Sequence, residues 1–580
     1  MSDQSRRRFP VGDPRKSAEQ YHQDMFQRRQ THTVSLRKER KEERLWRRRR
    51  QPPHSTSDRV VTVDELLQQY NLFLDNPHEI EKLKELQTSM AIDSASTHQF
   101  LQQLIDNPDL ETRNRLLIAS LRKILEENSG TMDDKGKASF KVLMEVTFFS
   151  LNVPKPSADD YYGMPALRWS DIVQEDELLI NLLVDWLRVP SANEESVGYV
   201  CIIVGNLLHD SARLIPFLTS AWGAIVKQLP FSSYLCATLI REDSTHLGAS
   251  FLYDLTPEKI ATLLRESSTA EEASFILEGL SRREEEAVQI LCGSLELMYA
   301  IVAVLEESMT SSNTQVLGPL LRATRNIFKQ SQHAKGLLLH PSFLPIISSI
   351  MEQGTELDSL EVATALLTWN GTLGNDEIGT LLVQTLLPVL VRIITSSSAS
   401  FPWKRDAAWA VCCSLHHDWS IEHHAVSPQA KGISVTWLSN QLSVPQSDFV
   451  RSLTDLLTSP DMEAVIPALQ ILDVLLRTIQ ATQQIFESAG GVDRLDMICE
   501  RGGEGSLSDF ASLLAADLLD DLFEADIEED SIILPCRGEN EFAFGVMEPQ
   551  KAFDFGVGNQ PGPGRGRGLT IPAWMQQSKR

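Results

Sequence analysis

The sequence predicts an all-α chain in which helices stack side by side into a long solenoid. Three observations lead to this fold class. From about residue 59 to 525, apolar residues recur at i, i+3 and i+4 in segments typical of amphipathic helices, such as 175–186, 314–328 and 359–373. Short breaks rich in Gly, Pro, Ser and Asp separate these segments. Strand-like alternation is scarce, so a sheet is not expected in the body of the chain.

The charge is divided unevenly along the chain. The 580 residues include 54 Lys and Arg and 79 Asp and Glu, a net charge of −25. Residues 1–50 hold 16 basic and 7 acidic residues, a net of +9, whereas the other 530 hold 38 and 72, a net of −34. This asymmetry indicates an interaction arm fused to an acidic body. An acidic body is not a general nucleic-acid binder, and a hydrophobic content of 42% is enough for a large core.

The composition also bears on the compartment. No apolar run reaches the roughly 18–20 residues of a membrane helix, and the nearest, Leu381 to Ile394, is broken by Gln384, Pro388 and Arg392. The N-terminus is charged and lacks an apolar core, so a secretory signal is not expected. The seven Cys lie mostly in apolar stretches, which predicts buried, reduced thiols in a cytosolic or nuclear protein.

Composition divides the chain into three domains. Residues 1–58 form a basic arm and linker, in which the charged stretch 37–50 has no Pro or Gly, favours a helix and needs an acidic partner. Residues 59–530 form the helical array, which ends in an acidic segment. Residues 531–580, dominated by Gly, Pro, Phe, Arg and Gln, are expected to be a disordered tail.

A weak pattern repeats along the array: an aromatic or bulky residue is followed four positions later by a polar or small one. The pairs are Phe148/Asn152, Ile202/Asn206, Tyr234/Thr238, Phe275/Gly279, Arg322/Asn326, Leu366/Asn370 and Trp409/Cys413. Their mean spacing is close to the ~40–47 residues of armadillo and HEAT units. Chance alignment of amphipathic helices is the alternative explanation.

Together these features resemble importin-α, the armadillo-repeat adaptor of nuclear import. The arm DMFQRRQTHTVSLRKERKEERLWRRRR (24–50) is similar to the importin-β-binding segment of that family, and VTVDELL (61–67) to the start of its array. GNLLHDS (205–211), GPLLRATRNIF (318–328) and KRDAAWAV (404–411) resemble its third, sixth and eighth repeats. The resemblance implies a right-handed armadillo superhelix.

It also implies a role for the arm. In the family a short basic cluster, an ELRK-like core and a terminal basic run bind importin-β. The matching residues here are Arg28, Arg29, Leu36, Arg37, Lys38, Arg40, Lys41, Arg44, Arg47, Arg48, Arg49 and Arg50. By the same logic the terminal run folds back on the acidic groove as a pseudo-substrate. A solvated helix or a nucleic-acid-binding arm is the alternative.

The resemblance further implies a groove for basic nuclear localisation signals. Holding an extended basic peptide requires amides that clamp its backbone, rings that stack on its lysine stems, and carboxylates that meet its charged heads. A ring and an amide four residues apart share one helix face. The candidate groove residues are Phe148, Asn152, Asn206, Asp210, Tyr234, Arg322, Asn326, Asn370, Asp406 and Trp409.

This candidate groove departs from the family pattern. No pair combines Trp with Asn, because Trp409 is followed by Cys413, and Lys155 with Pro156 interrupts the loop after Asn152. Two interpretations therefore stay open: a weakened groove, or packing remnants without a binding role. Rings such as Phe148 stack more weakly on cations than Trp does.

Other partners follow from the chain's end. The last repeat with residues 516–530 resembles the family's contact for an export receptor. Two Phe-x-Phe-Gly units, 542–545 and 553–556, resemble nucleoporin repeats, and the ending GRGRGLTIPAWM resembles RNA-processing proteins. A shuttling protein of cytoplasm and nucleus, with no membrane partner, is expected.

No enzyme or cofactor motif is present: GxxxxGK[ST], strand-linked GxGxxG, HExxH and GxSxG are all missing. A Cys/His cluster places Cys412 with His416 and Cys413 with His417 at i, i+4, and His423 and His424 follow. This spacing permits zinc but lacks a second Cys-x-x-Cys, so helix-end packing and no metal are expected.

Two functions remain in view. The first is a nuclear import adaptor that bridges basic-signal cargo to importin-β. The second is an armadillo scaffold with a degenerate groove, imported by its own arm and acting in a nuclear RNA-processing assembly.

Overall fold

The structure is a computed structural model of the chain. It describes residues 61–77, 79–127, 133–149, 169–188, 194–210, 212–242, 250–282, 285–330, 334–354, 356–369, 376–424, 433–442, 448–500, 506–523, 536–537 and 542–543. The basic arm and most of the tail therefore lie outside the described residues. The chain divides into two compact units, Leu36–Gly371 and Met1–Ser35 with Thr372–Arg580. We call their described parts the N-terminal unit (61–369) and the C-terminal unit (376–543).

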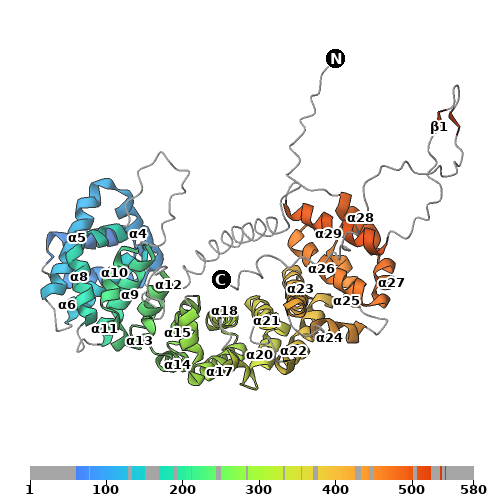
Figure 1. Ribbon diagram of the computed structural model, residues 1–580. Helices are drawn as coiled ribbons and strands as arrows, with labels where there is room; N and C mark the ends of the chain where they lie inside the picture. Colours follow the sequence, from blue (N-terminus) through green and yellow to red (C-terminus); the bar gives the residue numbers. More distant parts are fainter. Residues whose placement is uncertain are drawn as a thin grey trace, which may run out of the picture. The chain divides into compact units, whose positions relative to one another are not determined.

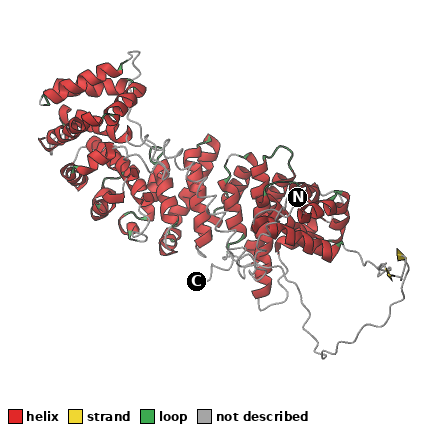
Figure 2. Ribbon diagram, turned by 90° about the horizontal axis from the view of Figure 1, so that it is seen from above, coloured by secondary structure: helices red, strands yellow, loops and turns green. Residues whose placement is uncertain are grey.

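In the described residues of the N-terminal unit, all regular secondary structure is helical (Figures 1 and 2). Its elements are α2 (Val63–Asp75), α3 (Ile80–Ile92), α4 (Ser94–Asp106), η1 (Pro108–Leu110), α5 (Glu111–Glu127), α6 (Asp134–Phe149), α7 (Trp169–Glu175), α8 (Glu177–Arg188), α9 (Glu194–Asp210), η2 (Ala212–Leu214), α10 (Ile215–Ser220), α11 (Trp222–Lys227), α12 (Ser233–Glu242), α13 (Phe251–Asp254), α14 (Pro257–Arg265), α15 (Ala270–Ser281), α16 (Glu285–Cys292), α17 (Leu295–Ser311), α18 (Thr314–Gln330), α19 (Lys335–Leu338), α20 (Phe343–Gln353) and α21 (Asp358–Leu367).

The C-terminal unit is also built of packed helices. Its helices are α22 (Asp376–Thr395), α23 (Phe401–His424), α24 (Ile433–Leu442), α25 (Asp448–Leu456), α26 (Met462–Thr478), α27 (Gln480–Ser488), α28 (Gly491–Glu500) and α29 (Ser506–Leu522). Two short strands, β1 (Cys536–Arg537) and β2 (Phe542–Ala543), pair antiparallel within the segment expected to be a disordered tail. Figure 2 draws them in yellow.

One helix in each repeat packs on its counterpart in the next repeat, which makes the chain an α-solenoid. In the N-terminal unit the consecutive contacts run α3, α6, α9, α12, α15, α18, α21, and in the C-terminal unit α23, α26, α29. We call these helices the central row. Figure 1 shows α12, α15, α18 and α21 side by side, with α14, α17 and α20 along the other edge. The predicted all-α solenoid is confirmed.

The repeat pattern predicted from the sequence follows the central row. Of the pairs whose members are described, Ile202/Asn206 lies on α9, Tyr234/Thr238 on α12, Phe275/Gly279 on α15, Arg322/Asn326 on α18 and Trp409/Cys413 on α23. The spacing therefore reflects one helix of this row per repeat. Each such helix buries a wide apolar stripe, as Ile276, Leu277 and Leu280 do on α15, because neighbours cover it on several sides.

The array begins with a capped helix. Thr62 Oγ1 accepts a hydrogen bond from the Glu65 amide at 3.3 Å, and Glu65 Oε2 accepts one from the Thr62 amide at 3.1 Å. This reciprocal capping box satisfies two backbone donors that a helix start otherwise leaves unpaired. The segment 61–67, which resembles the start of the family's array, is thus the physical start of α2.

The longest apolar stretch forms a longer helix than the sequence suggested. Glu377–Thr395 is one continuous segment of 19 residues with a mean hydropathy of 1.8, so by length and composition it meets the test for a membrane span. Pro388 lies inside this helix without ending it. Half of the segment is buried, and α22 packs on α23, α24 and α25. These contacts account for its apolar composition, as in the core helix of a solenoid.

The cysteines follow the prediction of buried thiols. In the described part of the chain Cys201, Cys236, Cys292, Cys412 and Cys413 are buried, and Cys499 is intermediate. Burial raises the pKa of the Cys236 thiol to about 12.

Candidate peptide-binding face

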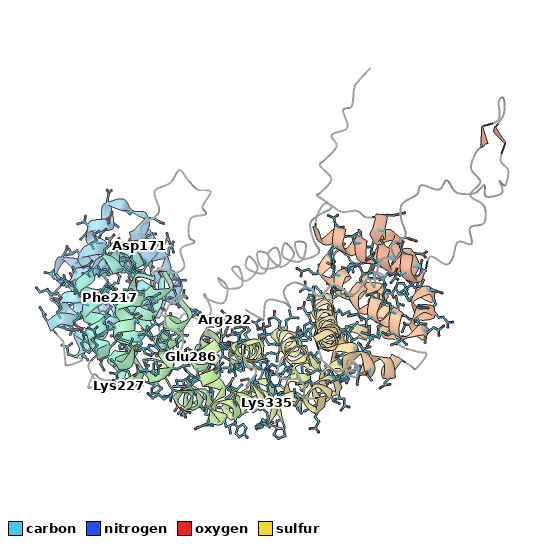
Figure 3. The ribbon with its side chains drawn as sticks, viewed as in Figure 1. Asp171, Phe217, Lys227, Arg282, Glu286 and Lys335 are labelled. Carbon is cyan, nitrogen blue, oxygen red and sulfur yellow. The ribbon has the colours of Figure 1, made fainter. Side chains whose placement is uncertain are left out.

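The central row carries most of the residues predicted for a signal groove. Figure 3 labels Arg282, just after α15, at the edge of the N-terminal unit where this row lies, and Lys227 and Lys335 at the opposite edge. Asn152 and Asn370 lie outside the described residues, as does the whole arm from Arg28 to Arg50. Asp210 is the last residue of α9, and its side chain is outside the described set.

On α6 the aromatic residue is in place, beside an acid. Phe148 is 6% exposed, and its ring stacks on the His98 ring of α4 at a centroid distance of 5.9 Å. Glu145, one turn earlier on α6, is 5% exposed, and burial raises the pKa of its carboxyl to about 8. Sequence analysis missed Glu145, because an isolated Glu in a helix is usually solvated.

On α9 and α12 two predicted residues bind each other. The Tyr234 hydroxyl donates to Asn206 Oδ1 at 2.9 Å and lies 3.4 Å from His209 Nε2. Asn206 is fully buried and Tyr234 is 6% exposed. The amide predicted to clamp a peptide and the ring predicted to stack on one are therefore engaged inside the protein.

On α18 the predicted residues belong to an ion-pair ladder. Arg322 binds Glu278 of α15 through two bonds, Nε to Oε1 at 2.8 Å and Nη2 to Oε2 at 2.9 Å. Its Nη1 also donates to Asp358 of α21 at 2.7 Å. Although burial opposes the charged form, the hydrogen bonds and charges of Glu278 and Asp358 raise the pKa of Arg322. The Arg322 side chain is 9% exposed, and each of its three guanidinium nitrogens donates to a carboxylate.

The ladder extends on both sides of Arg322. Arg282, 52% exposed, forms a second ion pair with Glu278. Arg325 pairs with Glu361 of α21 and donates to Asn326 Oδ1 at 3.2 and 3.1 Å. The Asn326 amide nitrogen in turn donates to the Ser281 hydroxyl at 3.2 Å. Three successive central-row helices are thus joined by polar side chains where a peptide receptor needs open amides.

In the C-terminal unit the predicted residues Asp406 and Trp409 lie on α23, and Asp406 is bound by a neighbouring arginine. Arg405 Nε donates to Asp406 at 2.9 Å, and its Nη1 lies 3.5 Å from Asp461 and 3.8 Å from Glu463. Trp409 is 7% exposed, so little of its indole face is open to a lysine stem. The three carboxylates around one arginine leave this end of α23 with a local excess of negative charge.

The polar contacts of α26 were not predicted from the sequence. The Cys412 thiol donates to Gln470 Oε1 at 3.0 Å, and Arg477 bridges Asp473 and Asp521 of α29 with Nε 2.5 Å and Nη2 2.9 Å from their carboxylates. Burial raises the pKa of Asp473, although Arg477 opposes this. These contacts satisfy the polar groups of the last two central-row helices.

The Cys/His cluster lies on α23, but the side chains of His416, His417, His423 and His424 are outside the described residues. Within the described side chains, no group of three or more His, Cys, Asp or Glu is placed to hold a metal ion. Burial raises the pKa of the Cys412 thiol well above its usual value, which disfavours a thiolate ligand.

A family model described as the importin beta binding domain matches residues 15–105. The match begins within the arm and continues past residue 58 through α2 and α3 into α4. No curated protein sequence matches the chain.

Among solved structures, an engineered protein is 14% identical, with a TM-score of 0.52, covering 80% of this chain and 99% of its own. A structure from a study of a phosphorylation switch in the interaction between cadherin and beta-catenin is 13% identical, covers 81% and 98%, and has a TM-score of 0.36. The first likeness concerns the fold alone. The domain match and the solenoid indicate an adaptor rather than an enzyme family. The chain therefore carries an N-terminal importin-β-binding domain.

Proposed function

We propose that the protein is a nuclear import adaptor that carries basic-signal cargo to importin-β and shuttles between cytoplasm and nucleus. The match of the importin-β-binding domain to residues 15–105 carries this proposal. The arm is the basic part of the chain, with a net charge of +9, and suits an acidic inner surface on the carrier. The body, with −34, suits basic cargo.

We place cargo binding at α6, the second helix of the central row. Glu145 is a buried carboxyl whose pKa is raised by burial alone. Phe148, whose ring stacks on His98, follows three residues later on the same helix. A lysine head group would supply the missing charge, and the rings would contact its stem. The carboxylates beside Arg322, by contrast, already pair with that arginine, so we expect no lysine subsite on α18.

Carrier binding is tested by pull-down with importin-β. We expect the full-length protein to bind and a form lacking residues 1–58 to lose binding. A matched control replaces the exposed Arg265 and Arg188 of the body by Gln, which removes two positive charges and leaves the arm intact. Equal binding by the truncated form would contradict the assignment of the arm.

Cargo binding is tested with a fluorescent lysine-rich peptide and the full chain. We expect Glu145→Gln to weaken binding by roughly tenfold, because a charge-assisted contact is lost. Glu296→Gln, which removes an acid that is 49% exposed on α17, is the matched control and should leave binding unchanged. The same loss in both variants would show only a general charge effect.

A second function is favoured by one observation: Asn206, Arg322 and Asn326 are all engaged by neighbouring side chains. In this case the body is a scaffold and the arm serves only for its own import. The tail, with its RG and Phe-x-Phe-Gly segments, would then contact RNA-processing proteins or nucleoporins. Retained importin-β binding without any peptide binding would favour the scaffold. We also propose an export-receptor contact at α28, α29 and the acidic segment that follows.

A further inference from the structure

Two Tyr–Asn pairs in the N-terminal unit look alike and differ in one respect. On α2 and α5, the Tyr70 hydroxyl donates to Asn114 Oδ1 at 2.9 Å, and the Asn114 amide nitrogen donates to the Leu104 carbonyl at 2.8 Å. On α12 and α9, the Tyr234 hydroxyl donates to Asn206 Oδ1 at the same 2.9 Å. The Asn206 amide nitrogen, however, is buried and has no hydrogen-bond partner within the described residues.

In the first pair both the oxygen and the nitrogen of the Asn amide are hydrogen-bonded, and we call this pair closed. In the second pair only the oxygen is bonded, and we call this pair half-open. An Asn amide offers two donors and an acceptor, and a buried donor without a partner costs free energy. Asn114 has partners on both sides of its amide and belongs to the core. Asn206 has a partner only for its oxygen, so its amide nitrogen can still donate a hydrogen bond to a carbonyl group.

The Tyr234 ring lies directly against the backbone of α9. A Cβ atom at Gly205 would fall 2.5 Å from Tyr234 Cε1 and 3.0 Å from Cδ1, so only glycine leaves room for the ring. With 6% exposure, Tyr234 has little ring face to offer a lysine stem. This differs from the stacking role expected from the sequence.

We propose that Tyr234 is a specificity-determining gate, an internal competitor of the cargo peptide for Asn206. The inference rests on the proposed function, binding of an extended basic peptide by the central row. Such a peptide presents a backbone carbonyl to the Asn206 nitrogen and an N–H to its oxygen. The N–H must displace the Tyr234 hydroxyl, and the ring must leave its place on Gly205.

The gate selects for ligands that form both backbone bonds. A peptide that offers only side-chain charge gains nothing from Asn206 and leaves Tyr234 in place. A peptide with a free carbonyl and N–H satisfies the amide fully and compensates for the lost tyrosine bond. Asn206 is then a binding residue, and the bond from Tyr234 to Asn206 is the interaction that a peptide must displace in order to bind there.

The test measures the affinity of the full chain for a fluorescent lysine-rich peptide by anisotropy. Tyr234→Phe keeps the ring and removes the competing hydroxyl, so we expect peptide binding two- to tenfold tighter, the effect of one neutral hydrogen bond. Gly205→Ala displaces the ring and should act in the same direction. Adding Asn206→Ala to Tyr234→Phe should abolish the gain, because the shared acceptor is gone.

Tyr70→Phe is the matched control. It removes the same hydroxyl from a closed Tyr–Asn pair and should lower thermal stability without changing peptide affinity. Wild-type binding with unchanged or weaker binding by Tyr234→Phe would overturn the gate and leave the proposed function intact. A stacking role for Tyr234 predicts unchanged affinity in Tyr234→Phe and weaker binding in Tyr234→Ala. No peptide binding by the wild type or any variant would overturn both.

Discussion

Glu145 shows how one carboxyl links stability to pH. Its pKa is about 8 in the folded chain because of burial, against an ordinary value near 4.5. The folded state therefore holds a proton that the unfolded state releases between these two values. The contribution of Glu145 to the free energy of unfolding is therefore most favourable below about pH 4.5, and it decreases as the pH rises towards 8.

The loss expected from Glu145 by pH 7.5 is about 4 kcal/mol at most. Glu145→Gln cannot ionise, so denaturant unfolding of this variant should show a flatter stability profile between pH 5 and 8 than wild type. Glu296→Gln, on the exposed side of α17, should keep the wild-type slope. Parallel profiles for Glu145→Gln and wild type would contradict a buried, protonated carboxyl.

Glu145 also gives the proposed cargo binding a pH dependence. A lysine head group favours the ionised carboxylate, so peptide binding releases the proton that Glu145 holds below pH 8. Affinity should therefore rise as pH increases from 6 to 8, by roughly tenfold per unit of pH at most. Anisotropy titrations at several pH values measure this slope, and Glu145→Gln should remove it.

Glu278 is the residue on which the ladder depends, because it pairs with both Arg282 and Arg322. Glu278→Gln leaves the buried Arg322 with only Asp358, and a broken buried pair is strongly destabilising. We expect a loss of about 3 kcal/mol in unfolding free energy. Arg265→Gln breaks an ion pair whose partners are 47% and 49% exposed and should cost less than about 1 kcal/mol. Similar costs would contradict the buried network.

At the scale of single elements, the sequence predicted most of what local patterns determine. Helical periodicity placed the helices, and the i, i+4 pairs fell on the central row, because each repeat has one helix of that kind. The start of α2 at residue 63 follows from Thr62 and Glu65, which lie three residues apart. These features depend on near neighbours in the chain.

The sequence could not predict contacts between distant elements. Tyr234 was interpreted as a stacking ring, but the close approach of its ring to Gly205 depends on how α12 lies against α9. Arg322 resembled a family position, but its partners Glu278 and Asp358 are 44 and 36 residues away. Glu145 gave no signal, because burial on α6 comes from packing and not from its neighbours in sequence.

The capping box of α2 gives an element-scale prediction. Thr62→Ala removes the acceptor for the Glu65 amide, and loss of an N-cap costs about 1 kcal/mol. Hydrogen exchange should be faster in the first turn of α2 and unchanged in α18, which lies far along the array. Uniformly faster exchange would indicate a global rather than a local loss.

For the whole molecule, the charge division predicts the salt dependence of carrier binding. The arm holds 16 of the 54 basic residues and has a net charge of +9. Contacts between exposed charges weaken as salt shortens the Debye length. We expect importin-β affinity to fall by about tenfold or more between 50 and 300 mM salt, measured by surface plasmon resonance. An affinity independent of salt would contradict an electrostatic arm.

The buried thiols allow the opening of each unit to be measured. Cys201, Cys236 and Cys292 lie in the N-terminal unit, and Cys412, Cys413 and Cys499 in the C-terminal unit. A thiol-alkylating reagent can modify a buried cysteine only when the surrounding helices separate. Labelling rates measured by peptide mass spectrometry therefore report the opening of each unit independently. Cys499, half-shielded on α28, should react first and provide an internal clock. Equal rates for the buried cysteines of the two units would mean that both units open as one cooperative body.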